Sequence, residues 1–147
     1  MAETQLATVG YFGEMELHNG TALTDLVQVK SIQIPGAGTR EQIETTHLKS
    51  AGWTREYVSG FYEDSDFEVT LNTRVLSDTD VLLADALLDA DTRAFRVVIP
   101  ENGAPVAQIT GTCKCIGYDR GTMEADSVLE ATATFRVVTV AAVAAYV

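Results

Sequence analysis

Strict alternation of apolar and polar residues in two segments is the sequence feature that most constrains the fold. In residues 67–72, Phe67, Val69 and Leu71 are separated by polar side chains. Residues 129–137 repeat the pattern, with apolar Leu129, Ala131, Ala133, Phe135 and Val137. Side chains of a β-strand point alternately to the two faces of a sheet, so each segment is expected to have one buried and one polar face. Such strands are typical of antiparallel sheets, in which one face packs on the core and the other contacts water.

Turn signals predict further strands around these two. Residues 94–99 and 106–118 are expected to pair through Asn102-Gly103, a dipeptide that is strongly preferred in tight hairpins. Residues 26–34 form another β-rich run, which ends at Pro35-Gly36-Ala37-Gly38. A short strand is also expected near residues 44–48.

One helix is predicted between the strands. Ser77-Asp78-Thr79-Asp80 has the form of a capping box, with which a helix begins. The helix is expected to span about 78–91. Its buried stripe is expected to carry Leu83, Ala84, Leu87 and Leu88, with Leu82 out of place on the opposite, acidic side.

These elements predict a mainly β fold. The 147 residues fit one domain, residues 1–147, with a single hydrophobic core. We expect an antiparallel β-sandwich or small barrel with one α-helix packed on it and a long inter-strand loop. The parts outside the core are an N-terminal arm at about 1–22, the irregular loop at about 49–66, and a C-terminal strand or tail at about 127–147.

Composition and charge exclude several functional classes. The chain has 10 basic and 21 acidic residues and a formal net charge of −11, which opposes tight binding of phosphate backbones. No basic segment followed by an apolar one is present at the start, so no signal peptide is expected. The apolar run at residues 137–147 is too short for a membrane span, which needs about 20 residues. We expect no membrane association.

The sequence lacks recognisable catalytic and metal-binding motifs. This favours a protein that is not an enzyme and has no cofactor or metal. Cys113 and Cys115 lie on one face of a strand, with Cα atoms roughly 6.5–7 Å apart, and are expected to be reduced and packed. His18 and His47 are the only histidines, and neither has zinc-ligand spacing. No phosphate-binding loop or nucleophile elbow occurs. The acids Glu63, Asp64, Asp66 and Glu68 lack the calcium-loop pattern and are expected to form a solvated edge.

One segment resembles a known family. Thr45-Thr46-His47-Leu48-Lys49-Ser50 precedes a glycine-containing loop, and Arg55-Glu56-Tyr57-Val58-Ser59-Gly60-Phe61 follows it. An acidic turn then leads to Phe67-Glu68-Val69-Thr70-Leu71-Asn72. This succession resembles the major tail tube proteins of long, non-contractile-tailed bacteriophages, most closely over residues 44–72. Members of that family often have Pro where Ser59 stands and Gly near residues 66–67.

The resemblance implies a structural virion protein that forms hexameric rings, which stack into the tail tube through which the genome is delivered. The implied partners are other copies of the chain, tail tip or baseplate and tail terminator proteins, the tape measure protein, and viral DNA that passes without tight binding. Synthesis in the host cytoplasm is implied as well. Within the loop, the expected inter-ring contacts are Trp53, Arg55, Glu56, Tyr57, Phe61 and Tyr62.

The channel wall is expected to be the polar side of a strand whose other side is buried. The sequence leaves two alternatives open. One strand offers Glu68, Thr70 and Asn72, and the other offers Glu130, Thr132, Thr134 and Arg136.

Two other functions compete with the tube. A monomeric carbohydrate- or ligand-binding β-sandwich would use Trp53 and Tyr57 as a stacking platform. A small hydrolase would use His47, but no motif positions a nucleophile for it. Apart from the resemblance, the aromatic residues of the loop could equally pack it onto the core, since large aromatics dominate cores and interfaces alike.

Overall fold

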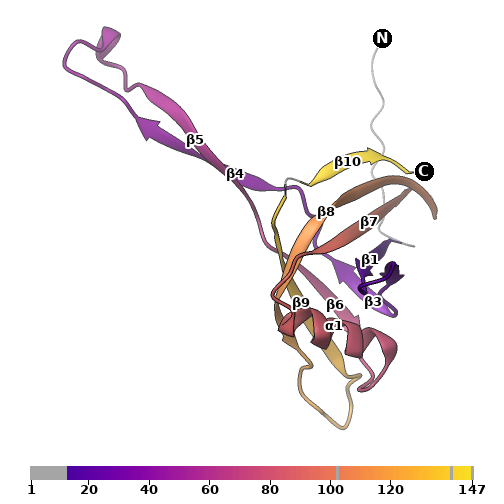
Figure 1. The fold of residues 1–147 in the computed structure, drawn as a ribbon. Helices are drawn as coiled ribbons and strands as arrows, with labels where there is room; N and C mark the ends of the chain where they lie inside the picture. Colours follow the sequence, from indigo (N-terminus) through magenta and orange to yellow (C-terminus); the bar gives the residue numbers. More distant parts are fainter. Residues whose placement is uncertain (1–12, 102, 140, 147) are drawn as a thin grey trace.

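The computed structural model describes residues 13–101, 103–139 and 141–146 (Figure 1). Its strands are β1 (Glu14–His18), β2 (Leu23–Asp25), β3 (Val29–Ile32), β4 (Gly38–Glu44), β5 (Tyr57–Asp64), β6 (Phe67–Asn72), β7 (Arg93–Glu101), β8 (Ala104–Asp119), β9 (Glu130–Val137) and β10 (Ala142–Ala145). The α-helix α1 spans Asp78–Leu88, and a short 3-10 helix spans Ala51–Trp53.

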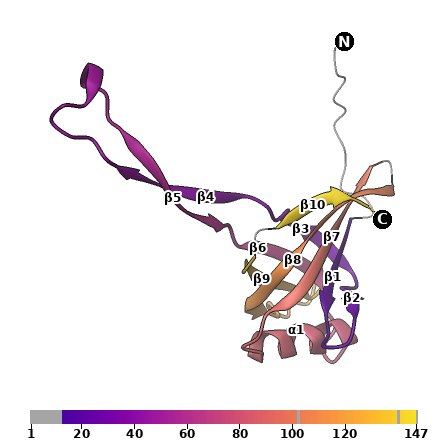
Figure 2. The same cartoon turned by 45° about the horizontal axis from the view of Figure 1, so that its top comes forward.

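Eight of these strands form one antiparallel sheet. Its order is β2-β1-β7-β8-β9-β6-β3, and β10 pairs with part of β8 that β9 does not reach. The sheet curves so that the half containing β1 and β7 faces the half containing β6 and β9, with the core between them (Figures 1 and 2). The expected sandwich-like antiparallel fold with one helix is confirmed.

The alternating strands behave as their sequence predicts. Phe67, Val69 and Leu71 of β6 are buried, and the buried side chains of β9 face the same core. The ring of Phe67 lies 5.3 Å, centroid to centroid, from each of Phe95 on β7 and Phe135 on β9. This aromatic cluster joins the two halves of the sheet. The predicted hairpin of β7 and β8 is also confirmed, with Gly103 at φ 78 in its turn.

Two expected strand positions were displaced. The run at 26–34 forms a strand only over β3, and the strand expected near 44–48 is instead β4, which ends at Glu44. The first 12 residues of the expected N-terminal arm lie outside the described residues, and the remainder includes β1. The C-terminal tail contains β10, which pairs with β8 as a terminal strand. No helix in the described part of the chain is long and apolar enough to cross a membrane.

The helix begins where the capping box predicts, but its buried face was predicted only in part: Leu83 is buried as expected, whereas Leu87 is exposed. The Ser77 side chain accepts a hydrogen bond from the backbone N–H of Asp80 at 3.3 Å. The helix ends at Leu88 rather than near residue 91. Leu82 is buried with Leu83, whereas Leu88 is exposed. The buried side of the helix also carries Asp80, whose carboxylate is 2% exposed.

Asp80 anchors the helix to the end of β8 through a partly buried cluster of hydrogen bonds. Its Oδ1 accepts from the Tyr118 hydroxyl at 2.6 Å and from Arg120 Nε at 2.8 Å. Its Oδ2 accepts from Arg120 Nη2 at 3.3 Å and from the backbone N–H of Leu76 at 3.1 Å. The bonds from Arg120 hold the pKa of Asp80 below its ordinary value. The charged form therefore stabilises the fold.

We predict that Asp80→Asn lowers the free energy of unfolding by about 2 kcal/mol, because Tyr118 and Arg120 lose the charged acceptor that the buried Asp80 provides. The loss is smaller than for a fully buried ion pair, since the Arg120 side chain is half-exposed. The carboxylate contributes fully above about pH 4, the ordinary pKa of Asp, and its contribution is lost as the pH falls through the lower folded value. Urea titrations of both proteins between pH 7 and pH 2 measure this. The difference should shrink with acid. Asp85→Asn, on the exposed side of the helix, should change stability by less than about 0.5 kcal/mol.

Part of the segment expected to be an irregular loop at 49–66 is a strand: β5 pairs with β4 in a second, separate two-stranded sheet. Strands β4 and β5 pair from Gly38 opposite Asp64 to Glu44 opposite Tyr57. This hairpin projects away from the body of the protein (Figures 1 and 2). All seven residues of β4 are exposed, so no buried face imposes an alternating pattern. The period that reveals β6 and β9 is therefore missing, although the strands form.

Candidate interaction surfaces

Two surfaces of the protein contain the residues that the sequence singled out. The first is the β4–β5 hairpin, whose connecting residues 45–55 we call the hairpin tip. The second is the outward side of β6 and β9 and of the strands beside them, which we call the polar face. On β6 and β9 it consists of Glu68, Thr70, Asn72, Glu130, Thr132, Thr134 and Arg136.

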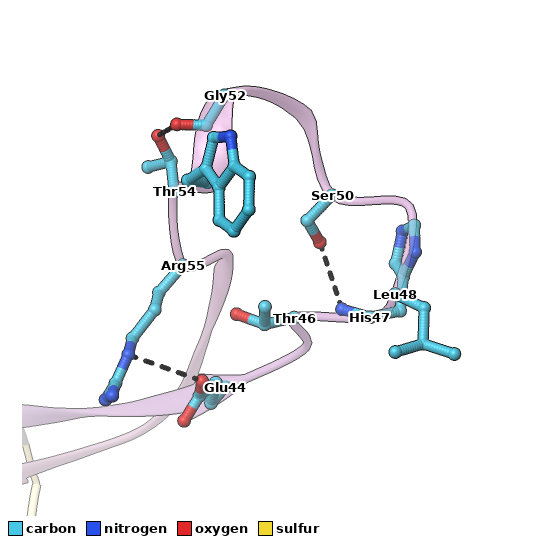
Figure 3. Close-up of a pocket in the computed structure, with 9 residues that line it drawn as sticks. Glu44, Thr46, His47, Leu48, Ser50, Gly52, Thr54 and Arg55 are labelled. Carbon is cyan, nitrogen blue, oxygen red and sulfur yellow. Dashed lines mark hydrogen bonds and ion pairs between the residues drawn. The ribbon is translucent and has the colours of Figure 1, made fainter.

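Local hydrogen bonds shape the hairpin tip. The Thr46 hydroxyl accepts from the backbone N–H of Glu56 at 2.7 Å, and the Thr45 N–H donates to the Glu56 carbonyl at 2.7 Å. The Ser50 hydroxyl accepts from the His47 N–H at 3.0 Å (Figure 3). The chain then turns through Gly52, whose φ of 67 favours glycine. The tip is thus a defined structure.

The aromatic residues of the hairpin are exposed rather than packed on the core. Trp53 is 103% exposed and Phe61 is 86% exposed, and Tyr57 and Tyr62 are at least partly exposed. The core explanation for these aromatics is therefore wrong. Arg40 lies 5.5 Å from the ring centroid of Tyr62, so local contacts order part of the surface. Such an exposed set of large apolar side chains is typical of a protein-binding surface.

The charged contact candidates lie at the base of the tip. Arg55 Nε is 4.0 Å from a carboxylate oxygen of Glu44 (Figure 3). Glu56 accepts a hydrogen bond from the Ser50 hydroxyl at 3.2 Å and lies 3.6 Å from His47 Nε2. Both residues are well exposed, so they form a polar rim beside the aromatic side chains.

The hollow beside the tip does not form an enclosed ligand site. It is lined by Glu44, Thr46, His47, Leu48, Ser50, Gly52, Trp53, Thr54 and Arg55, and it opens to solvent (Figure 3). In the described residues, no group of three or more His, Cys, Asp or Glu side chains is placed to hold a metal ion. Across the described ranges of the chain, the His47 side chain is not hydrogen-bonded to a nucleophile. Its Nδ1 accepts a hydrogen bond from the Lys49 N–H at 3.1 Å.

The two predicted sets of channel residues lie on one face instead of forming alternatives. Strands β6 and β9 are neighbours in the sheet, with Glu68 opposite Thr134 and Thr70 opposite Thr132. Asn72 is opposite Glu130 in the same register. Because directly paired residues of antiparallel strands point to the same side, the two sets form a continuous polar face. Sequence periodicity alone could not reveal this pairing.

Ion pairs with residues outside the predicted sets balance the charge of the polar face. Lys30 on β3 pairs with Glu130. Arg136 donates to both carboxylate oxygens of Asp66, at 3.1 and 3.3 Å. Lys114 on β8 lies opposite Arg136. The net acidity of the chain is therefore not concentrated on this face.

The two cysteines are buried and unbonded, as predicted. Burial raises the pKa of Cys113 to about 12 and also raises that of Cys115. Both thiols thus remain protonated at neutral pH and are poor nucleophiles.

Comparison with known families decides the identity of the fold. The model of the family described as "Lambda phage tail tube protein, TTP" matches residues 15–144. The chain belongs to this family. Its role is that of a structural tail tube protein, a component of the virion. A comparison with curated protein sequences finds no match.

Solved structures share the fold of this tail tube protein at low sequence identity. A chain in the 6-fold symmetrised baseplate of the anti-feeding prophage is 12% identical, with a TM-score of 0.74 over 96% of this chain and 97% of that chain. A chain in the tail of an empty gene transfer agent particle, with C6 symmetry, is 16% identical, with a TM-score of 0.67 over 91% and 95%. The SPP1 tail tube is 12% identical, with a TM-score of 0.67 over 96% and 81%.

Proposed function

We propose that the protein assembles into hexameric rings that stack into the tube through which the viral genome leaves the virion. The observation that carries this proposal is the projecting β4–β5 hairpin with its exposed aromatics, in a chain of the tail tube family. Apolar side chains that remain in water do not stabilise a monomer, whereas their burial in a contact between copies would stabilise the assembly. Sixfold symmetry is supported by the similarly folded chains found in C6 and 6-fold assemblies.

The hairpin is proposed to make the contact between rings. Its contact residues are Trp53, Arg55, Glu56, Tyr57, Phe61 and Tyr62. Eight residues of β5, at about 3.3 Å per residue, give a strand of roughly 26 Å, which carries the hairpin tip away from the eight-stranded sheet. Aromatic and arginine side chains are the usual anchors of protein interfaces.

The polar face is proposed to line the channel. It is a continuous sheet surface of threonine, asparagine and charges of both signs, backed by the core. Charges of both signs present little net attraction for phosphate, which suits DNA that passes without tight binding. The tape measure protein is proposed to occupy the same channel before the DNA.

Reversing one charge on this face tests the channel assignment. Glu68→Lys should slow genome ejection at least about twofold at low salt, because a sixfold ring of added cations attracts phosphate. The effect should weaken as salt is raised. The control Glu14→Lys makes the same charge change on the exposed side of β1. Ejection is timed from particles with intact tubes, and equal rates for Glu68→Lys and wild type at low salt would contradict the assignment.

The remaining partners follow from the same proposal. The tube ends are proposed to bind tail tip or baseplate and tail terminator proteins, after synthesis in the host cytoplasm. We propose a structural rather than an enzymatic role, because the chain belongs to a family of tail tube proteins. Sedimentation velocity over a range of protein concentrations tests assembly. Concentration-dependent large species are expected, whereas a monomer with saturable sugar binding would favour the carbohydrate-binding alternative.

A further inference from the structure

Two exposed apolar side chains stand on unfavourable backbone. Trp53 at the hairpin tip has φ 60, and Leu76 just before α1 has φ 68 and is 83% exposed. Bulky residues other than glycine rarely adopt this left-handed conformation, which persists where the surroundings impose it and is concentrated at functional sites. At Leu76 the surroundings are the buried carboxylate of Asp80, which accepts the Leu76 N–H at 3.1 Å. The fold thus holds Leu76 out in water.

Leu76 continues into an exposed stripe along the helix. Asp78, Val81, Asp85 and Leu88 follow at spacings of three, four and three residues, so they lie on one side of α1. Together with Leu76 they form what we call the α1 outer face. Leu88 is 86% exposed. Within the described chain, the ion pairs of this region engage Asp80 and Asp89 rather than Asp78 or Asp85. The face is therefore apolar and anionic.

The hairpin tip has the complementary character. Its charged residues, apart from His47, are Lys49 and Arg55. The flanking acid Glu44 lies 4.0 Å from Arg55 and the flanking Glu56 lies 3.6 Å from His47, so Lys49 is the cation that the ion pairs of the described residues leave available. Leu48 and Trp53 supply fully exposed apolar side chains. The end of the tip is therefore apolar and carries the cation Lys49. It lies far from α1 in the same chain (Figures 1 and 2), so the two surfaces do not meet within one subunit.

We propose that the α1 outer face is the surface on which the hairpin tip of a second copy docks, in the adjacent ring. This inference rests on the proposed stacking of rings and names the counter-surface for the hairpin. Apolar contacts of Leu48 and Trp53 with Val81 and Leu88 supply affinity, and opposite charges set the orientation. A contact between two different patches is heterologous, so it repeats from copy to copy instead of closing as a dimer.

Charge reversal tests the pairing. Lys49→Glu and Asp85→Lys should each raise the protein concentration needed for tube formation about tenfold, because each places like charges in the contact. The double variant restores opposite charges and should return most of the wild-type value. Glu14→Lys is the control for a change of the same size elsewhere. Assembly is followed by light scattering, and circular dichroism confirms folding of each variant. A double variant no better than the worse single variant would overturn the pairing.

Cross-linking locates the contact independently. Thr54→Cys on the tip and Leu88→Cys on α1 are combined in one chain, and assembled tubes are oxidised; Cys113 and Cys115 are buried and stay unreactive. A covalent ladder of copies is expected. Thr54→Cys with Glu14→Cys should give none. Intact tubes without a ladder from the first pair would overturn this inference and leave the tube itself established. Absence of tubes from the unaltered protein would instead contradict the proposed function.

Discussion

Removal of the hairpin tip is expected to abolish tube formation and leave the subunit folded. In the variant, Asn-Gly replaces residues 46–55, so Thr45 and Glu56 are joined by a two-residue turn of the type that antiparallel strands favour. These residues already bond across the hairpin, the Thr45 N–H to the Glu56 carbonyl at 2.7 Å. Because the hairpin is separate from the eight-stranded sheet, its shortening removes no core contact.

The measurement pairs thermal unfolding with light scattering at high concentration. The melting temperature should stay within a few degrees of wild type, and scattering should remain at the monomer level. A control variant with Leu23→Ser, remote from the hairpin on β2, should still assemble. Tubes of normal appearance from the shortened protein would show that the hairpin does not join the rings.

Two aromatic truncations are expected to affect different properties, one the stability of the fold and the other the assembly of the tube. Phe67→Ala should destabilise the fold by about 3–5 kcal/mol, since it empties the centre of the aromatic cluster with Phe95 and Phe135. Trp53→Ala should change the free energy of unfolding by less than about 0.5 kcal/mol, because its side chain is fully exposed. Its effect should fall on assembly instead, with a loss of about 2 kcal/mol or more per contact.

Urea unfolding and assembly yield separate these effects. Tyr57→Ala, whose side chain is only partly exposed, provides an intermediate comparison. Loss of stability in Trp53→Ala, in step with loss of assembly, would return this residue to a packing role. Unimpaired assembly by stable Trp53→Ala protein would remove it from the contact.

The strands whose two faces differ in environment were predictable from the sequence. In β6 and β9 one side faces the core and the other faces water. Apolar and polar residues therefore alternate along both strands. The β7–β8 turn was predictable because Asn-Gly suits its backbone. Strands β4 and β5 have neither signal, since water surrounds most of both sides. Their structure depends on cross-strand hydrogen bonds, which leave no apolar pattern.

The orientation of α1 was not predictable because it depends on distant residues. Asp80 reads as an exposed capping acid in the sequence, but Tyr118 and Arg120, about 40 residues later, bury it. That cluster brings Leu82 to the core and leaves Leu88 outside. The pairing of β6 with β9 is a similar case. It merges two candidate channel walls into one face, and only the sheet register reveals it.

Electron cryomicroscopy of the purified, assembled protein would show whether the hairpin joins adjacent rings. We expect stacked rings of six copies, with the β4–β5 hairpin of each copy crossing to the adjacent ring and the polar face of β6 and β9 on the channel. Density in which the hairpins stay within their own ring, or a preparation that contains only monomers at every concentration even with a tail tip present, would contradict this expectation.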